Sequence, residues 1–169
     1  MDIDFTHIEG IIFDLDGTLV ASELNFSAIK AHLGCPDTSD ILEYLSSLTD
    51  EQSQQQAHQY ILDQELADAQ HAGWLDTGKW LVNTALSRQL PIAIVTRNSI
   101  EATRLKIANN AIPIELVLTR EDAPPKPDPT ALLSIARHWD IPPKKCLYVG
   151  DFIYDQQAAE NAGMKWLLV

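Results

Sequence analysis

The stretch Asp14-Leu15-Asp16-Gly17-Thr18 is the most informative part of this sequence. It follows the apolar run from Ile8 to Phe13, which is typical of a buried strand. Two carboxylates two residues apart repel each other, and the glycine after them adds chain entropy that folding must remove. Such a cluster indicates a site for a cation, and a divalent metal with a phosphate is the simplest candidate.

Apolar runs alternate with helical patterns along most of the chain. The later runs, each near-continuous as in strands buried on both faces of a parallel sheet, are Pro91–Thr96, Glu115–Leu118, Cys146–Val149 and Trp166–Val169. Helical patterns cover Lys79–Gln89, Ser99–Asn109, a segment that begins with Asp128 as cap and Pro129 as first helical residue, and Tyr154–Ala162. This alternation predicts an α/β fold with a Rossmann-like doubly wound parallel sheet.

One segment interrupts the alternation. Residues 21–75 contain no convincing strand, and three helical patterns fill them: Leu24–Leu33, Ser39–Leu48 and Asp50–Ala72. This stretch is far longer than a single crossover helix requires. We therefore expect a core formed by residues 1–20 and 76–169, with a small helical cap inserted after the first strand at residues 21–75.

Composition limits the possible partners. Of the 169 residues, 46% are hydrophobic and 21% are charged, which is a globular balance. No stretch approaches the roughly 20 apolar residues that span a bilayer, and the acidic N-terminus lacks the basic region of a signal peptide, so we expect a cytoplasmic protein without membrane contact. The net charge of -12 argues against binding to nucleic acid.

Polar residues collect where the predicted strands end. Asp14 and Asp16 follow the first strand, Thr96-Arg97-Asn98 the second, and Gly150-Asp151, with Asp155 four residues later, the fourth. Lys126 stands in the proline-rich segment Ala123–Pro129, which holds the backbone stiff. In open α/β sheets, ligands bind at the carboxyl ends of the strands, so these groups are expected to converge on one pocket.

Each of these groups has a chemical interpretation. Asp14 is a candidate metal ligand or nucleophile, and Asp16 could exchange a proton while its partner stays ionised. Asp151 supplies another carboxylate for Mg²⁺, which prefers oxygen ligands. Thr96 offers a hydroxyl donor to a phosphoryl oxygen, and Lys126 is suited to neutralising a phosphate.

The four groups together resemble the haloacid dehalogenase superfamily of phosphohydrolases. The first motif, DxDGT, is Asp14 to Thr18; the second is Thr96; the third is Lys126; and the fourth, GDxxxD, is Gly150 to Asp155. All four occur in order, and the resemblance covers nearly the whole chain. The sequence is most similar to phosphoglycolate-phosphatase-like members that carry a helical cap.

The resemblance implies a mechanism. Asp14 would attack phosphorus to form an aspartyl phosphate, and Asp16 would protonate the leaving alcohol and then take a proton from water. Mg²⁺ would be held by Asp14, the backbone carbonyl of Asp16 and Asp151, with support from Asp155. Thr96 and Lys126 would stabilise the transferring phosphoryl group, and Arg97 and Asn98 are further candidates for binding a small phosphorylated metabolite.

Several alternatives remain at this point. The dehalogenase branch lacks a second carboxylate, so Asp16 argues against dehalogenation. A phosphomutase of the β-phosphoglucomutase type needs both aspartates, as a phosphatase does. A phosphoacceptor or non-catalytic binding protein on the same fold is a further possibility from another class. The short cap, and Ala21 where many relatives have Asp, leave substrate recognition open.

Overall fold

A computed structural model describes residues 4–169 of the chain. Within that range, five strands form one sheet in which every strand runs parallel to its neighbours. The strands are β1 (Gly10–Phe13), β2 (Ile92–Val95), β3 (Leu116–Leu118), β4 (Cys146–Gly150) and β5 (Lys165–Leu168). Their order across the sheet is β3-β2-β1-β4-β5, which confirms the predicted doubly wound fold.

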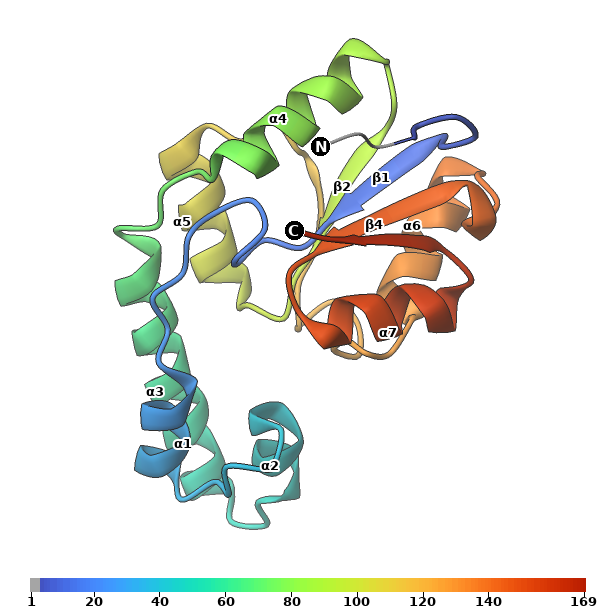
Figure 1. Cartoon of the computed structure of the whole chain (residues 1–169). Coiled ribbons are helices and arrows are strands. Elements are labelled where there is room, and N and C mark those ends of the chain that lie inside the picture. Colours follow the sequence, from blue (N-terminus) through green and yellow to red (C-terminus); the bar gives the residue numbers. More distant parts are fainter. Residues whose placement is uncertain (1–3) are drawn as a thin grey trace.

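Helices cover both faces of this sheet (Figure 1). On one face lie α4 (Asp76–Ser87) and α5 (Ile100–Asn110), and on the other lie α6 (Thr130–Trp139) and α7 (Ile153–Ala162). Side chains alternate along a strand, so Ile11 and Phe13 of β1 join the first layer while Ile12 joins the second. All three side chains are fully buried. A short 3-10 turn, Pro143–Lys145, leads into β4.

Two local expectations are wrong. The runs Glu115–Leu118 and Trp166–Val169 are predicted to be buried on both faces, but β3 and β5 are the two edge strands of the sheet. The residues of β3 are half-buried, and Trp166 of β5 is 43% exposed. An edge strand has a neighbouring strand on one side alone, so less of its surface is covered. Pro129 is predicted as the first helical residue of α6; it stands one residue earlier, at the N-cap, and Asp128 accepts the backbone N–H of Thr130.

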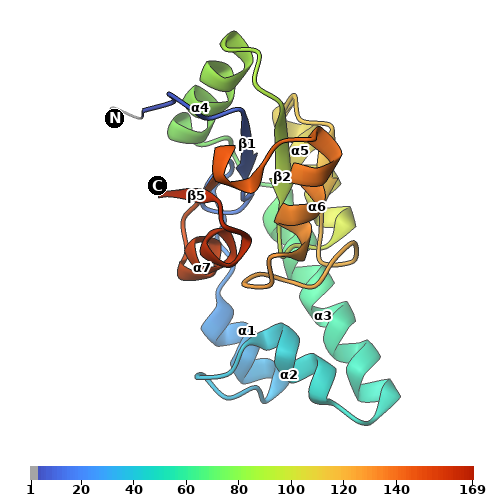
Figure 2. The ribbon, with the colours of Figure 1, turned by 90° about the vertical axis from the view of Figure 1, so that its right-hand side faces the viewer.

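Between β1 and β2 the chain forms α1 (Phe26–Leu33), α2 (Ile41–Ser47) and α3 (Glu51–Ala69). They share a small apolar core around Ile29, Leu45 and Ile61, and Figures 1 and 2 show them extending below the sheet, beyond the carboxyl end of β1. The boundaries of this insert, 21–75, remain a prediction. Among residues 4–169, no helix is both long enough and apolar enough to cross a membrane.

The chain leaves and re-enters the core through two hydrogen-bonded segments. The backbone N–H of Ala21 donates to the carbonyl of Gly73 at 2.9 Å, and that of Leu75 donates to Leu19 at 2.8 Å. Val20 and Trp74 form an antiparallel bridge between the same segments. The insert is therefore closed at its base by backbone contacts.

Gly78 marks where α4 crosses the loop that follows β1. A methyl group there would lie 2.4 Å from the Thr18 carbonyl oxygen and 2.9 Å from Cα of Leu19. Replacing glycine by alanine within a helix ordinarily gains about 1 kcal/mol. We expect Gly78→Ala instead to lower the free energy of unfolding by about 1–3 kcal/mol, because backbone atoms must move apart.

Urea unfolding followed by circular dichroism measures this effect. Gly73→Ala is the matched control, since a methyl group at Gly73 meets nothing within 4 Å. A Gly78→Ala variant as stable as the wild type would contradict the close approach of α4 to this loop.

Candidate active site

The polar residues named from the sequence lie where the strands of the sheet have their carboxyl ends. This end of the sheet is formed by the loops after β1, β2 and β4. The segment after β3, which carries Lys126, also reaches it. The strand order diverges between β1 and β4, and the crevice at such a divergence is where open α/β sheets bind ligands. The fold therefore brings the predicted residues to one region.

Three carboxylates form the centre of this region. Asp14, Asp151 and Asp155 each place one oxygen within 4.8 Å of the other two. Gly17 makes part of this approach possible: it has a φ of +76°, and a methyl group on it would lie 2.1 Å from Asp151 Oδ2. The glycine of the first motif is thus required by both its backbone conformation and the neighbouring carboxylate.

Lys126 faces these carboxylates from the buried side. Its Nζ lies 2.8 Å from Asp14 Oδ1, 2.6 Å from Asp155 Oδ1 and 2.7 Å from the Tyr148 hydroxyl. Burial alone would lower the pKa of Lys126, but Asp14 and Asp155 raise it above its ordinary value. The ammonium group therefore stays charged at neutral pH.

Both oxygens of Asp155 are occupied. Oδ1 accepts from Lys126 and lies 3.1 Å from the Tyr148 hydroxyl, while Oδ2 accepts the backbone N–H groups of Asp151 and Phe152 at 3.1 and 3.0 Å. Asp155 thereby fixes the turn between β4 and α7. Asp14 and Asp151 are the carboxylates better placed to bind a cation directly.

The charges of the site fit a divalent cation. Three carboxylates face one ammonium group, so the cluster carries excess negative charge when all are ionised. Burial raises the pKa of Asp14 to about 7; Lys126 opposes this rise and Asp155 adds to it. Burial also raises the pKa of Asp151, again with a contribution from Asp155. A cation among these oxygens would favour their ionised forms, and an all-oxygen ligand set suits Mg²⁺.

The side chain of Asp16 points to other partners. Its Oδ2 accepts from Asn98 Nδ2 at 2.7 Å and its Oδ1 from Lys106 Nζ at 2.5 Å. Burial raises the pKa of Asp16, against the opposing effect of Lys106. Both oxygens of the Asp16 carboxylate thus have partners outside the acidic cluster, and a metal-binding role for this residue stays a prediction.

The residues that follow β2, Thr96 to Asn98, form what we call the rim of the candidate site. Thr96 is buried, and its Oγ1 accepts the N–H of Asn98 at 3.1 Å, so its proton can still be donated to another group. Asn98 is buried as well, and its Oδ1 has no hydrogen-bond partner within residues 4–169. A buried amide oxygen without a partner is uncommon, and a water molecule or a ligand often supplies the missing donor.

Arg97 links this rim to the insert. Its guanidinium donates to Asp40 Oδ2 at 2.5 Å and to the Lys126 carbonyl at 2.6 Å, and it lies over the Tyr154 ring at 4.9 Å. Asp40 is also the N-cap of α2, where it accepts from two backbone N–H groups. The insert therefore touches the rim of the site directly.

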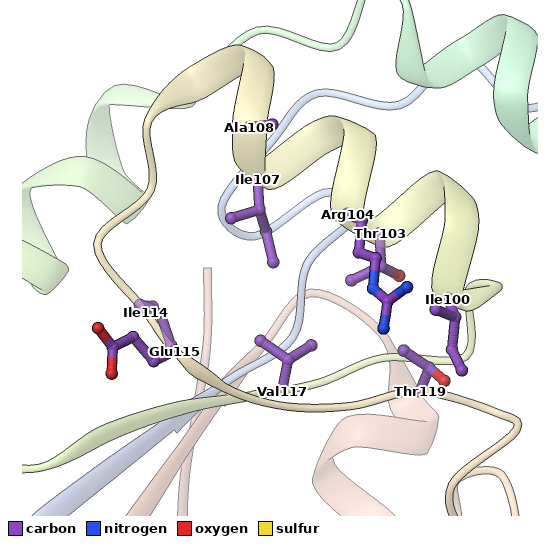
Figure 3. Close-up of a pocket in the computed structure, with 9 residues that line it drawn as sticks. All are labelled: Ile100, Thr103, Arg104, Ile107, Ala108, Ile114, Glu115, Val117 and Thr119. Atoms are coloured by element: carbon purple, nitrogen blue, oxygen red, sulfur yellow. The ribbon is translucent and has the colours of Figure 1, made fainter.

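A separate hollow of about 350 Å³ lies between α5 and β3 (Figure 3). Ile107 and Val117 point into it, and Thr103 and Arg104 line it from the helix. None of the acidic residues of the cluster contributes to its wall. The hollow is distinct from the candidate active site.

Comparison with known proteins places the chain in a family. The family model of haloacid dehalogenase-like hydrolases matches residues 11–169. The chain belongs to this family. The uncharacterized hydrolase YOR131C of Saccharomyces cerevisiae is 33% identical over 171 residues, which cover 93% of this chain and 75% of the yeast protein. This protein is therefore a hydrolase, in agreement with the resemblance of its motifs.

Solved structures share the fold of this hydrolase at low identity. A hydrolase from Pseudomonas syringae has a TM-score of 0.75 and 21% identity, covering 95% of this chain and 83% of its own. A predicted phosphoglycolate phosphatase from Haemophilus somnus has a TM-score of 0.70 and 20% identity, covering 96% and 85%. CbbY from Rhodobacter sphaeroides, in complex with phosphate, has a TM-score of 0.70 and 20% identity, covering 95% and 85%.

Two buried groups of this hydrolase escaped the sequence analysis. Tyr148 stands in an apolar run, yet a buried tyrosine hydroxyl needs a partner, and here it contacts Lys126 and Asp155. Lys106 stands four residues after the buried Ala102, a spacing at which two side chains share one face of a helix. The available signal was a hydroxyl within an apolar run for Tyr148, and a lysine one helical turn from an apolar residue for Lys106.

Proposed function

We propose that this hydrolase is a Mg²⁺-dependent phosphatase that cleaves a small phosphomonoester through an aspartyl phosphate on Asp14. The observation that carries the proposal is the position of the Asp14 carboxylate. It lies in the acidic cluster, is held by Lys126 at 2.8 Å, and belongs to the same short loop as Asp16, which has contacts of its own. A nucleophile, a fixed positive charge and a proton carrier are the groups that phosphoryl transfer requires.

The metal would be bound mainly by Asp14 and Asp151, with the backbone carbonyl of Asp16. Asp155 would act indirectly, because its oxygens already hold Lys126 and the turn after β4. When bound, Mg²⁺ would neutralise charge on the phosphoryl oxygens.

In the first step, a carboxylate oxygen of Asp14 attacks phosphorus and the bond from phosphorus to the ester oxygen breaks. Asp16, in its protonated form, gives its proton to the departing alkoxide, which leaves as an alcohol. In the second step, Asp16 takes a proton from water while the water oxygen attacks phosphorus. The bond between phosphorus and Asp14 then breaks, inorganic phosphate is released, and the starting protonation states return.

The remaining site residues would bind the phosphoryl group and the rest of the substrate. Lys126 carries a positive charge that can stabilise the transferring group, and Thr96 has a hydroxyl proton to donate. The buried Oδ1 of Asn98 has no hydrogen-bond partner among residues 4–169, which suits contact with a substrate donor or water. Arg97 lies at the rim, where it would contact the part of the ester that extends toward the insert.

The direct test is release of inorganic phosphate from a panel of phosphorylated metabolites and from 4-nitrophenyl phosphate. We expect turnover with Mg²⁺, complete loss in excess EDTA, and recovery when Mg²⁺ is restored. Failure to release phosphate from any ester with Mg²⁺ present would contradict the proposal. If turnover required a sugar bisphosphate, and the phosphoryl group were transferred to a sugar instead of released as inorganic phosphate, the protein would be a mutase.

A further inference from the structure

Lys106 is a buried cation that contacts Asp16 and the insert at once. The side chain of this α5 residue is 0% exposed. Its Nζ lies 2.5 Å from Asp16 Oδ1 and 2.8 Å from Asp68 Oδ2 on α3. Burial alone would lower the pKa of Lys106, but Asp16 and Asp68 raise it, so the ammonium group remains charged between them.

Asp68 in turn holds the segment through which the chain enters the insert. Its Oδ1 accepts the backbone N–H of Glu23 at 2.7 Å, and its Oδ2 accepts the Ser22 hydroxyl at 3.0 Å. Burial would raise the pKa of Asp68, but the hydrogen bond from Lys106, followed by those from Glu23 and Ser22, lowers it below its ordinary value. Asp68 therefore joins the outgoing chain to the ammonium group of Lys106, which in turn contacts the Asp16 carboxylate.

Three ion pairs in the described part of the chain join the insert to the core, and they are not equivalent. Asp40 pairs with Arg97, Glu65 with Arg120, and Asp68 with Lys106. Arg120 contacts Glu65 and the Arg97 carbonyl, but not Asp16. Lys106 is the member of this set that also contacts the candidate proton carrier.

Stability alone gives no reason for this arrangement. Removing an ammonium group and two carboxylates from water costs free energy that an apolar side chain in the same space would not. The carboxylate of Asp16 is held at both oxygens, by Asn98 and by Lys106, which limits rotation about its side-chain bonds. A restricted carboxylate is closer to the geometry that proton transfer needs.

We propose that Lys106 is a positioning residue that orients the Asp16 carboxylate for proton transfer to the leaving group and makes this orientation depend on the docking of α3 through Asp68. This inference rests on the proposed phosphatase function. Lys106 acts through Asp16, and Asp68 fixes Lys106.

Leaving-group dependence tests this role. Phenyl phosphate releases a basic phenolate that needs a proton, whereas 2,4-dinitrophenyl phosphate releases a weakly basic one that needs little help. With saturating Mg²⁺, we expect Lys106→Met to lower kcat for phenyl phosphate roughly 10–100-fold, a part of the roughly 10²–10⁴-fold that general acid catalysis contributes, because Asp16 itself remains. We expect kcat for the dinitrophenyl ester to change less than about threefold. Asp16→Asn removes the proton carrier itself, so it gives the lowest expected ratio of kcat for phenyl phosphate to kcat for the dinitrophenyl ester.

Arg120→Met is the matched control, because it removes another ion pair to α3 without touching Asp16. We expect it to change both rates by the same factor. Equal losses on both esters in Lys106→Met would reduce Lys106 to a structural role, and an altered ratio in Arg120→Met would assign the effect to docking in general. Either result would overturn the inference.

Asp68→Ala keeps the ammonium group of Lys106 and removes the carboxylate that holds it. This variant therefore tests the inference even if Lys106→Met fails to fold. We expect the ratio of phenyl to dinitrophenyl turnover to fall at least about threefold, a smaller change than in Lys106→Met. An unchanged ratio would refute the link to α3. Absence of turnover on both esters by the wild type would refute the proposed phosphatase function itself, which is a separate result.

Discussion

Asp14→Asn is expected to abolish turnover, with a loss of at least about 10⁴-fold in kcat, the scale found when a covalent nucleophile is removed. The amide has nearly the same shape as the carboxylate and can still accept from Lys126, which lies 2.8 Å from Oδ1 in the wild type. It cannot attack phosphorus as an anion. Phosphate release measures the loss, and mass spectrometry after an acid quench seeks the phosphorylated Asp14 peptide.

Asp140→Asn is a suitable control for this substitution. Asp140 is exposed at the end of α6 with a φ of 56°, a conformation that asparagine also adopts. The control should retain full activity. Residual activity of Asp14→Asn within tenfold of the wild type, or an acid-quenched phosphate on another residue, would remove Asp14 from the nucleophilic role.

Lys126→Met is expected to damage both stability and activity. Without the ammonium group, Asp14 and Asp155 face each other uncompensated, and breaking a buried ion pair in this way costs about 3–5 kcal/mol. Loss of a fixed positive charge at the transferring group should also lower kcat by roughly 10²–10³-fold. Urea unfolding in EDTA gives the first quantity free of any metal effect, and phosphate release with Mg²⁺ gives the second.

Lys145→Met isolates the effect of burial. Lys145 also forms an ion pair, with Glu9 at 2.6 Å, but the two side chains are 40% and 48% exposed. Exposed pairs contribute about 0–1 kcal/mol, so this variant should be nearly as stable as the wild type. Similar free energies of unfolding for the two variants would show that the pairs of Lys126 contribute no more than a surface contact.

The sequence predicts the fold well because the relevant signals are local. Each strand is a short apolar run. In a parallel sheet, the polar residues that follow such runs all lie at the same end of the strands. This is why the sequence alone assigns Asp14, Thr96 and Asp151 to one region. The exposure of β5 could not be predicted in the same way, since an apolar run does not reveal whether a strand has one neighbour or two.

The finer arrangement of the site depends on contacts that are remote in sequence. Lys106 lies 90 residues after Asp16, and Arg97 lies 57 residues after Asp40. No local pattern reports which lysine of a helix will meet which carboxylate. The Asp16 side chain contacts Asn98 and Lys106, and this arrangement follows from those distant partners and not from the motif that contains it.

The paired segments at the base of the insert have an evolutionary consequence. Because Ala21 is joined to Gly73 and Leu75 to Leu19 by backbone hydrogen bonds, the spacing at the base does not depend on which side chains follow. Loop closure entropy grows slowly with length, so α1 and α2 can be extended, shortened or exchanged at modest thermodynamic cost without altering strand register. The insert can therefore change in length and sequence during evolution while the strands of the core keep their places.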